Sequence, residues 1–207
     1  MSQNSLSNYS LKMKTNIRAL QKENTRKTLL EMAVTLFSQQ GISTTTTSEL
    51  AKFANVSHGT IFLHFSTRDN LLFEVINAFG AKLSSKFNEI ATSSDNTRAI
   101  LKAHLQVLEE CECFYTRLIE ELPSLPDKSR SHFFILQSSI SQHIYLQMQK
   151  DIQQGLIKNL ERSKLFNTWI ALIHYYLTNK RIFSPDNSLI ASMGDELINH
   201  FIDLIKK

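Results

Sequence analysis

The chain has 207 residues, of which 42% are hydrophobic and 20% charged, the composition of a globular protein with a sizeable core. Its 5 Gly and 3 Pro are too few for the many turns of an all-β fold, and no apolar run is long enough to cross a membrane. The net charge is +4, and residues 1–70 carry all of this excess, with eight Lys or Arg against four Asp or Glu. Basic charge gathered at one end indicates either contact with a polyanion or a solvated basic tail.

Residues 1–21 lack the apolar core that a secretory signal needs, and we expect them to form a flexible basic tail. The two cysteines, Cys111 and Cys113, are separated by one residue, so a disulfide between them would be strained. A reducing cytoplasm is therefore the expected compartment.

Apolar residues at helical spacing predict a first helix over residues 24–40, which Gly41 would end. A second, short helix is expected over 47–54. Thr46 and Glu49 are three residues apart at its start, the spacing of a capping box.

Asn55 follows the second helix, and asparagine enters the left-handed backbone region at low cost, which suits a tight turn. Ser57 is placed to cap a third helix over 58–65. A small residue, Ala51, stands where these two short helices would cross. Helix, tight turn and helix together predict a helix-turn-helix domain over 22–70.

The remaining chain is predicted to be helical throughout. Apolar spacing predicts helices over 68–91, 96–113, 131–154, 163–183 and 187–205. Ser66 and Asp69 form a capping-box pair before the first of these, and Pro123 and Pro126 require a break before the third. The expected fold class is all-α, with a second helical domain over 71–207.

The third helix would present one face outward to read DNA, because Ile61 and Phe65 are four residues apart and belong inside. We expect His58 and Thr60 to contact base edges and Leu63 to contact a thymine methyl group. His64 would contact a phosphate or a base, and Thr45, Thr46 and Arg68 would contact phosphates. The predicted DNA-binding set also includes Ser57, Gly59 and Phe62. Two alternatives stay open: a solvated surface position for His58 and a packed, hydrogen-bonded position for His64.

Two C-terminal helices with broad apolar stripes, 163–183 and 187–205, would pack either within the chain or against a twofold-related copy as a four-helix bundle. Helix-turn-helix readers usually bind as dimers with recognition helices about one duplex turn apart, which favours the bundle between copies. The expected dimerisation residues are Leu165, Trp169, Ile173, Tyr176, Leu189, Met193, Leu197 and Phe201.

The stretch LLEMAVTLFSQQGISTTTTSELAKFANVSHGTIFLHFSTRDNLL resembles the N-terminal domain of the TetR/AcrR family of bacterial transcriptional regulators. That family's pattern runs L-F-x-x-x-G, T-[ST], I-A-x-x-A-G-V-S, K-G-T-L-Y-Y-H-F and S-K-E-x-L. The chain matches it at Leu36, Phe37, Gly41, Thr45, Thr46, Ala51, Ala54, Val56, Ser57, Gly59, Thr60, His64, Phe65 and Leu71. The resemblance covers about residues 25–72, and the rest of the chain resembles the family only in being helical.

Several positions depart from the family pattern. Asn55 replaces the usual turn glycine, Thr47 a usual aliphatic residue, and His58 the common lysine. Phe62 and Leu63 replace two tyrosines, so both phenolic donors to phosphate are missing. DNA affinity is therefore expected to depend more on backbone N–H groups, on the arginine at position 68 and on the basic pair at positions 26 and 27.

The resemblance implies a cytoplasmic homodimer that binds a palindromic operator as a regulator, in our expectation a repressor rather than an activator, and that is neither an enzyme nor dependent on a cofactor. It further implies that residues from about 90 onward form a regulatory and dimerisation domain, with a small effector between its helices. Candidate effector-binding residues are His104, Phe114, Tyr115, His132, Phe133, Trp169, His174 and Tyr175, whose chemistry suits a lipophilic or aromatic compound. Each of them also fits a role as core filling.

Three rival interpretations stand beside the regulator. An enzyme lacks support because the chain has no phosphate-cradling Gly-rich loop, no G-x-S-x-G and no H-E-x-x-H. A metal or redox sensor would use Cys111 and Cys113, but two residues i and i+2 on a helix point about 200° apart, so no metal site is assigned. A helical interaction module with degraded DNA binding remains the third, because the two tyrosines and the lysine are missing.

Overall fold

The computed structural model describes residues 3–207 of the chain, and side chains from residue 16 onward. This part of the chain is built of α-helices, with one 3₁₀ turn and no β-strand, which confirms the all-α prediction. The helices are α1 (Gln3–Gln40), α2 (Thr47–Phe53), α3 (His58–His64), α4 (Arg68–Ala91), α5 (Thr97–Glu109), α6 (Glu112–Glu121), α7 (Asp127–Gln153), α8 (Arg162–Thr178), α9 (Lys180–Phe183) and α10 (Leu189–Ile205), and the 3₁₀ turn covers Leu122–Ser124.

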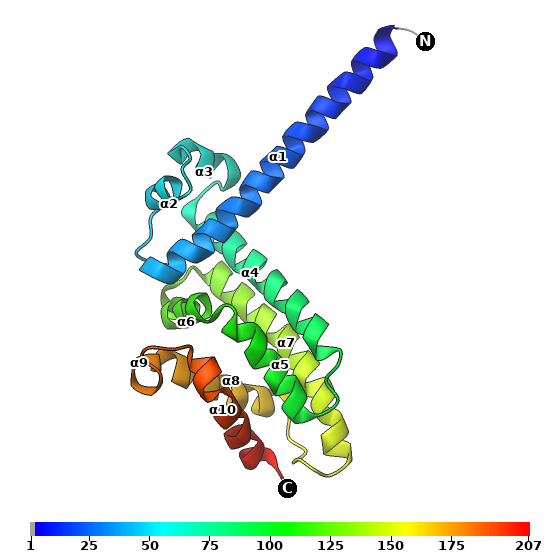
Figure 1. Cartoon of the computed structure of the whole chain (residues 1–207), viewed down its shortest axis with the longest axis vertical. Helices are drawn as coiled ribbons and strands as arrows, with labels where there is room; N and C mark the ends of the chain where they lie inside the picture. The colour runs from blue at the N-terminus through cyan, green and yellow to red at the C-terminus, as the bar shows by residue number, and fades with distance from the viewer. Residues whose placement is uncertain (1–2) are drawn as a thin grey trace.

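The segment expected as a flexible tail, residues 1–21, is helical from Gln3 and runs without a break into the predicted first helix. Residues 1–2 lie outside the described residues. The sequence offers a reason for the continuation, because no Gly or Pro occurs before Gly41 to stop the helix. Figure 1 shows α1 extending well past the small helices α2 and α3.

Helices α1, α2 and α3 and the start of α4 form a small unit around one core, which we call the head. Its fully buried side chains include Leu29, Ala33, Leu50, Ile61, Phe65 and Leu72. The turn between α2 and α3 depends on Asn55, the one non-glycine residue with positive φ in the described chain, at 51°. Both the burial of Ile61 and the left-handed turn agree with the sequence prediction.

The helix caps of the head agree with two of the three predicted ones. Thr46 accepts a hydrogen bond from the Glu49 N–H at 3.2 Å, and the Glu49 carboxylate accepts one from the Thr46 N–H at 2.8 Å. Ser57 caps α3 by accepting the Thr60 N–H. The third was wrong: Thr67, not Ser66, caps α4.

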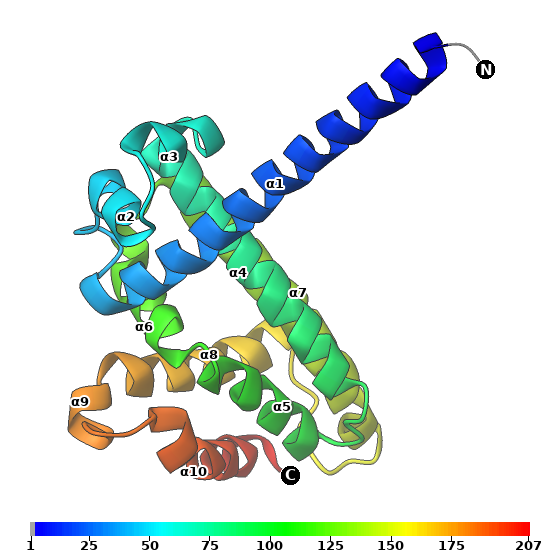
Figure 2. The same cartoon turned by 45° about the horizontal axis from the view of Figure 1, so that its top comes forward.

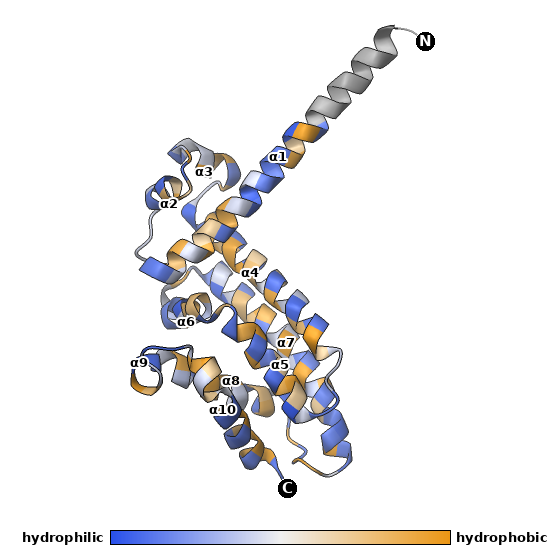
Figure 3. Ribbon diagram, in the orientation of Figure 1, coloured by the Kyte–Doolittle hydropathy of each residue, from blue (hydrophilic) through white to orange (hydrophobic). Residues whose placement is uncertain are grey.

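The body contains the rest of α4 and helices α5 to α10. Helices α4 and α7 run side by side, α5 lies against both, and α8 and α10 close the far side, as Figures 1 and 2 show. Apolar and polar residues alternate around these helices in Figure 3, which is the pattern of amphipathic elements around one core. No helix in residues 3–207 is both long enough and apolar enough to cross a membrane.

Two helices that the sequence predicted as continuous are broken. The expected helix 96–113 divides into α5 and α6, and the expected helix 163–183 divides into α8 and α9. At the first break, the Glu112 carboxylate accepts hydrogen bonds from the N–H groups of Leu189 and Ile190 and from the Ser188 hydroxyl. A tertiary cap for α10 thus accompanies the break, a long-range feature that local spacing does not reveal.

Substitutions at Asn55 test the left-handed turn of the head. Asn55→Val should lower the free energy of unfolding by about 1–2 kcal/mol, because a β-branched side chain resists positive φ. Asn55→Gly should change it by less than about 0.5 kcal/mol. Urea unfolding of both variants measures this, and equal losses in the two would contradict the role of the turn.

Candidate functional site

The outward face of α3 is apolar at two positions. Leu63 is 69% exposed and Phe62 is 44% exposed, while Ile61 and Phe65 on the opposite face are buried. His58, Ser57 and Gly59 at the start of the helix are also exposed. Exposed neighbouring apolar side chains on a short helix are a feature of surfaces that bind a partner.

His58 is held in place between α2 and α3. Its Nε2 lies 3.0 Å from the Thr47 hydroxyl, and its ring meets the edge of the Phe62 ring at a centroid distance of 4.9 Å. Thr47 was not among the predicted site residues, although its place beside the capping threonine was a signal for it. The three side chains form one surface across both short helices.

Some predicted DNA contacts are already engaged within the protein. The Thr45 hydroxyl is buried and donates to the Gly41 carbonyl at 2.6 Å, so the predicted phosphate contact by this hydroxyl is wrong. Thr60 is half-buried, and its hydroxyl pairs with that of Ser57 at 2.8 Å. His64 is half-buried as well. Burial, followed by the charge of Lys22, lowers its pKa. The residue is packed, as the alternative expected, but its ring Nδ1 is buried without a hydrogen-bond partner.

The Arg68 guanidinium hydrogen-bonds to backbone carbonyls of the same chain instead of facing solvent. Its guanidinium donates to the Ile42 carbonyl at 2.6 Å and to the Ser43 and Thr45 carbonyls at 3.4 Å. The side chain is half-buried in this position. The predicted phosphate contact is therefore corrected: Arg68 fixes the turn between α1 and α2.

Arg26 is engaged in the same way. It donates to the His64 carbonyl at 2.6 Å, pairs with the Glu74 carboxylate at 3.0 Å and lies 4.6 Å from the centre of the Phe65 ring. One guanidinium thus joins α1, α3 and α4. Of the basic pair expected to support DNA affinity, only Lys27 is exposed.

The α1–α2 turn is also held from the body, by Glu121 at the end of α6. One carboxylate oxygen accepts the Ile42 N–H at 2.8 Å and the other accepts the Ser43 N–H at 2.6 Å. Partial burial opposes ionisation of Glu121, but the hydrogen bonds from Ser43 and Ile42 and the nearby Arg117 outweigh it and lower its pKa. The partners are 78 and 79 residues apart, so sequence spacing carried no signal for this contact.

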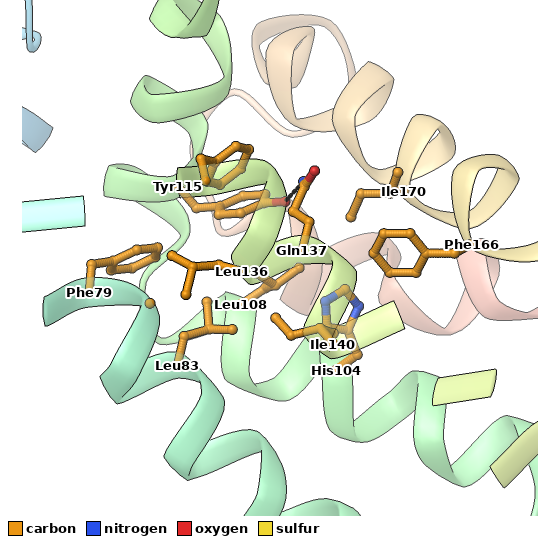
Figure 4. Close-up of a pocket in the computed structure, with 12 residues that line it drawn as sticks. Phe79, Leu83, His104, Leu108, Tyr115, Leu136, Gln137, Ile140, Phe166 and Ile170 are labelled. Carbon is orange, nitrogen blue, oxygen red and sulfur yellow. Dashed lines mark hydrogen bonds between the residues drawn. The ribbon is translucent and has the colours of Figure 1, made fainter. Parts of the chain in front are cut away.

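A small cavity of about 20 Å³ lies inside the body between α4, α5, α6, α7 and α8 (Figure 4). Three of the eight predicted effector residues line it: His104, Tyr115 and Phe133. The other lining residues are Phe79, Gly80, Leu83, Leu108, Leu136, Gln137, Ile140, Phe166 and Ile170. The sequence analysis did not predict Gln137 as a lining residue. It lies four residues after Phe133 and therefore on the same face of α7, which could have indicated it.

The other five predicted effector residues lie around or away from the cavity. Trp169 and His174 hydrogen-bond to residues that line it, and Phe114 packs against one of them. His132 instead pairs with Asn77, and Tyr175 is 59% exposed, so their assignment to the cavity wall is corrected.

The polar groups in and around the cavity form two separate hydrogen-bonded sets. The Trp169 Nε1–H donates to His104 Nδ1 at 3.1 Å. The Tyr115 hydroxyl lies 2.8 Å from His174 Nε2 and accepts from the Gln137 amide at 3.2 Å. Burial, followed by the neighbouring His174, lowers the pKa of His104 to about 3, and burial lowers the pKa of His174 to about 4. Both histidines are therefore neutral at physiological pH.

The predicted dimerisation stripe faces the interior of its own chain. Its buried members are Leu165, Trp169, Ile173, Leu189, Leu197 and Phe201, while Tyr176 and Met193 are half-buried. The Trp169 and Phe201 rings, for example, meet at a centroid distance of 5.2 Å. The assignment of the six buried residues to a dimer interface is corrected, since an apolar stripe does not reveal whether its own chain or a copy covers it, while Tyr176 and Met193 stay predictions.

The cysteines lie at the α5–α6 break, Cys111 partly buried against the core and Cys113 exposed. Burial raises the pKa of the Cys111 thiol to about 12, so this thiol is a poor nucleophile, and Cys113 is exposed. Among the side chains of residues 16–207, no three His, Cys, Asp or Glu gather as a metal site would require.

The head and body together define a class of protein: a helix-turn-helix DNA-binding domain carried on an all-helical body. Residues 29–75 match the family model of bacterial regulatory proteins, tetR family. The HTH-type transcriptional repressor KstR2 of Rhodococcus jostii (strain RHA1) is 33% identical over 82 residues, which is 40% of this chain and 40% of that relative. The match thus spans less than half the length of this curated relative.

Solved structures extend the likeness over the body. The regulator FadR from Bacillus subtilis, in complex with stearoyl-CoA, has a TM-score of 0.71 at 16% identity and covers 84% of this chain and 96% of that one. AibR, in complex with isovaleryl coenzyme A and operator DNA, has a TM-score of 0.67 at 14% identity, with coverages of 88% and 98%. At such identities the likeness shows the fold. The match of residues 29–75 to the tetR family model and the shared fold of the body together support a regulator of that family.

Glu121→Gln should weaken DNA binding by about three- to tenfold and lower the free energy of unfolding by about 1–2 kcal/mol. The amide keeps one acceptor but turns a donor toward the second N–H, so the turn loses one bond and the head becomes more mobile. Fluorescence anisotropy with labelled duplex DNA measures the affinity. Glu120→Gln, on the exposed neighbour that pairs with Arg117, is the matched control and should bind as the wild type does.

The neutral histidines predict a pH dependence of stability. Their pKa values of about 3 and 4 lie below the ordinary 6.5, so the unfolded chain binds more protons than the folded one below that pH. The stabilising contribution of the neutral histidines is fully present above pH 6.5. As the pH falls from 6.5 toward 4, the free energy of unfolding should decrease by about 1.4 kcal/mol per pH unit for each histidine. Urea unfolding at pH 7, 6 and 5 tests this. His104→Gln should flatten the dependence, and the exposed His143→Gln should not.

Proposed function

We propose that the chain is a transcriptional regulator, in our reading a repressor, that binds a palindromic operator as a homodimer and is released by a small effector. The observation that carries the proposal is the exposed apolar face of α3 on a head whose arginines Arg26 and Arg68 are bound within the protein. Phe62 and Leu63 suit thymine methyl groups, and the imidazole of His58 offers a polar group beside them.

Direct readout would come from a surface that spans both short helices. His58 and Thr47 lie at the N-terminal side of α3, with Leu63 one turn further along. Phosphate contacts would come from exposed groups near this surface, such as Lys27. The N–H and hydroxyl of Thr46 already donate to the Glu49 carboxylate. Arg68 and Arg26 would not contact phosphates, because their guanidinium groups hydrogen-bond to backbone carbonyls within the head.

Dimerisation would use faces of the body that its own core leaves uncovered. On α8 these include the 59% exposed Tyr175, and on α10 the 48% exposed Leu204. Two heads related by a twofold axis would bind half-sites about one duplex turn apart. KstR2 is described as a repressor, which supports the direction of regulation proposed for this chain.

The effector would enter the internal cavity of the body. The fold neighbours FadR and AibR were solved with acyl-coenzyme A compounds, which supports a compound with an apolar part. At about 20 Å³ the cavity has room for about one water molecule, so a larger ligand must move its walls. Two of those walls belong to α4 and α6, the helices that also contact the head, and a ligand favouring one arrangement of them would shift DNA affinity.

Selection of bound sequences from random duplex DNA tests the proposal. We expect enrichment of a twofold-symmetric sequence. Phe62→Ala should reduce affinity for the enriched sequence by about tenfold or more, since a lost contact to a base is worth about 1–3 kcal/mol. Phe134→Ala, which removes a similarly exposed phenylalanine on α7, is the control and should leave affinity unchanged.

Failure to enrich any sequence, at salt low enough to permit non-specific binding, would contradict the proposal. Equal losses of affinity in the Phe62 and Phe134 variants would remove the assignment of α3 as the reading element.

A further inference from the structure

We propose that the cavity accepts an uncharged, mainly apolar compound whose hydrogen-bond acceptor, such as a ketone, ester or thioester carbonyl, lies on the Nε2–H of His104. This inference rests on the proposed function, in which the cavity is the effector site. It adds the chemical class of the ligand and the residue that selects it.

The walls of the cavity offer no charge. His104, Tyr115 and Gln137 are the polar residues that line it, and no Lys, Arg, Asp or Glu does. A carboxylate that enters this cavity loses its hydration and gains no counter-charge, so its ionised form is disfavoured there. The walls therefore select against ionised acids.

Trp169 determines which atom of His104 carries the proton. The indole Nε1–H donates to Nδ1 of the imidazole at 3.1 Å, and an indole nitrogen is a donor only. Nδ1 must therefore present its lone pair, and the proton of the neutral ring lies on Nε2. A second proton, on Nδ1, would set two N–H groups against each other, so Trp169 keeps His104 neutral even beside an anion.

The proton on His104 Nε2 is available for a ligand. Within residues 16–207 the structure gives His104 one hydrogen bond, the one through Nδ1, although the residue is only 2% exposed. This N–H has no acceptor among the described side chains, and a ligand carbonyl would supply one. A ligand in the cavity could therefore place a hydrogen-bond acceptor on His104 Nε2.

The remaining polar groups are largely committed to one another. The Tyr115 hydroxyl pairs with His174 Nε2 at 2.8 Å and accepts from the Gln137 amide nitrogen at 3.2 Å, as Figure 4 shows for the second contact. The amide oxygen of Gln137 has no hydrogen bond among the described side chains, so the cavity offers one N–H donor and one amide acceptor. A neutral carbonyl compound matches this pair, and a second polar group on it would have to be a donor.

The wall that must move for such a compound is on α7. Leu136 is half-buried, and a Cβ at Gly80 would overlap its side chain. The glycine therefore lets the two helices approach until the cavity holds little more than one water. Displacement of Leu136 is the simplest way to enlarge the site, and it would separate α4 from α7.

Calorimetric titration with a matched series tests the proposal on the whole protein at pH 7.5. The probes are 2-nonanone, methyl octanoate, octanoate and nonane. Trp169 is the chain's single tryptophan and adjoins the site, so its fluorescence gives a second readout. We expect the ketone and ester to bind at least tenfold more tightly than octanoate.

Two variants separate recognition from folding. His104→Phe should lower ketone affinity by about tenfold and leave nonane affinity unchanged, while His200→Phe, on an exposed histidine of α10, should change neither. Trp169→Phe frees Nδ1 for a proton, so octanoate should gain affinity at pH 6 relative to the wild type.

The proposal is overturned if octanoate binds the wild type as tightly as 2-nonanone, if no member of the series binds, or if Trp169→Phe gains nothing for octanoate. None of these results depends on DNA, so they leave the selection of an operator sequence standing. Conversely, binding of the ketone by a protein that enriches no DNA sequence would remove the proposed function and retain the ligand class.

Discussion

The short turn between α1 and α2 is the joint on which the arrangement of head and body depends. Its backbone is held from both sides: Glu121 of the body accepts the N–H groups of Ile42 and Ser43, and Arg68 donates to the carbonyls of the same residues. Charged groups bonded to backbone make strong hydrogen bonds, so this turn has little freedom to shift alone. Under the proposed function, a shift of α6 would therefore reach the helices that carry the proposed reading surface.

Helix α6 also connects this joint to the interior of the body. Tyr115 on its buried face belongs to the cavity and bonds His174 of α8, while Glu121 lies at its C-terminal end. At its other end, Glu112 caps α10. One ten-residue helix thus touches the cavity, the head and the C-terminal helices, and a ligand that moves it has a direct mechanical route to α3.

The structure of the head could be predicted from residues that are close in sequence. The contacts between the head and the body could not, because their partners are far apart in sequence. The Thr46–Glu49 capping box, the Asn55 turn and the inward side of α3 follow from neighbours in sequence. The roles of Arg68 and Glu121 do not, because their partners are 23 to 79 residues away and an exposed charge looks the same in sequence as one that binds backbone. The apolar stripe of α8 and α10 was likewise visible, but its spacing could not say that its own chain covers it.

Amide hydrogen exchange at Ile42 and Ser43, followed by NMR, most directly tests whether Glu121 fixes the joint. In the wild-type protein we expect both amides to exchange far more slowly than in an unfolded chain, and the Glu121→Gln protein should lose at least tenfold of that protection while the amide of Ile61 in α3 keeps its own. Rapid exchange of both amides in the wild type would mean that the body does not hold the head through this carboxylate, and the proposed link between cavity and reading surface would fail with it.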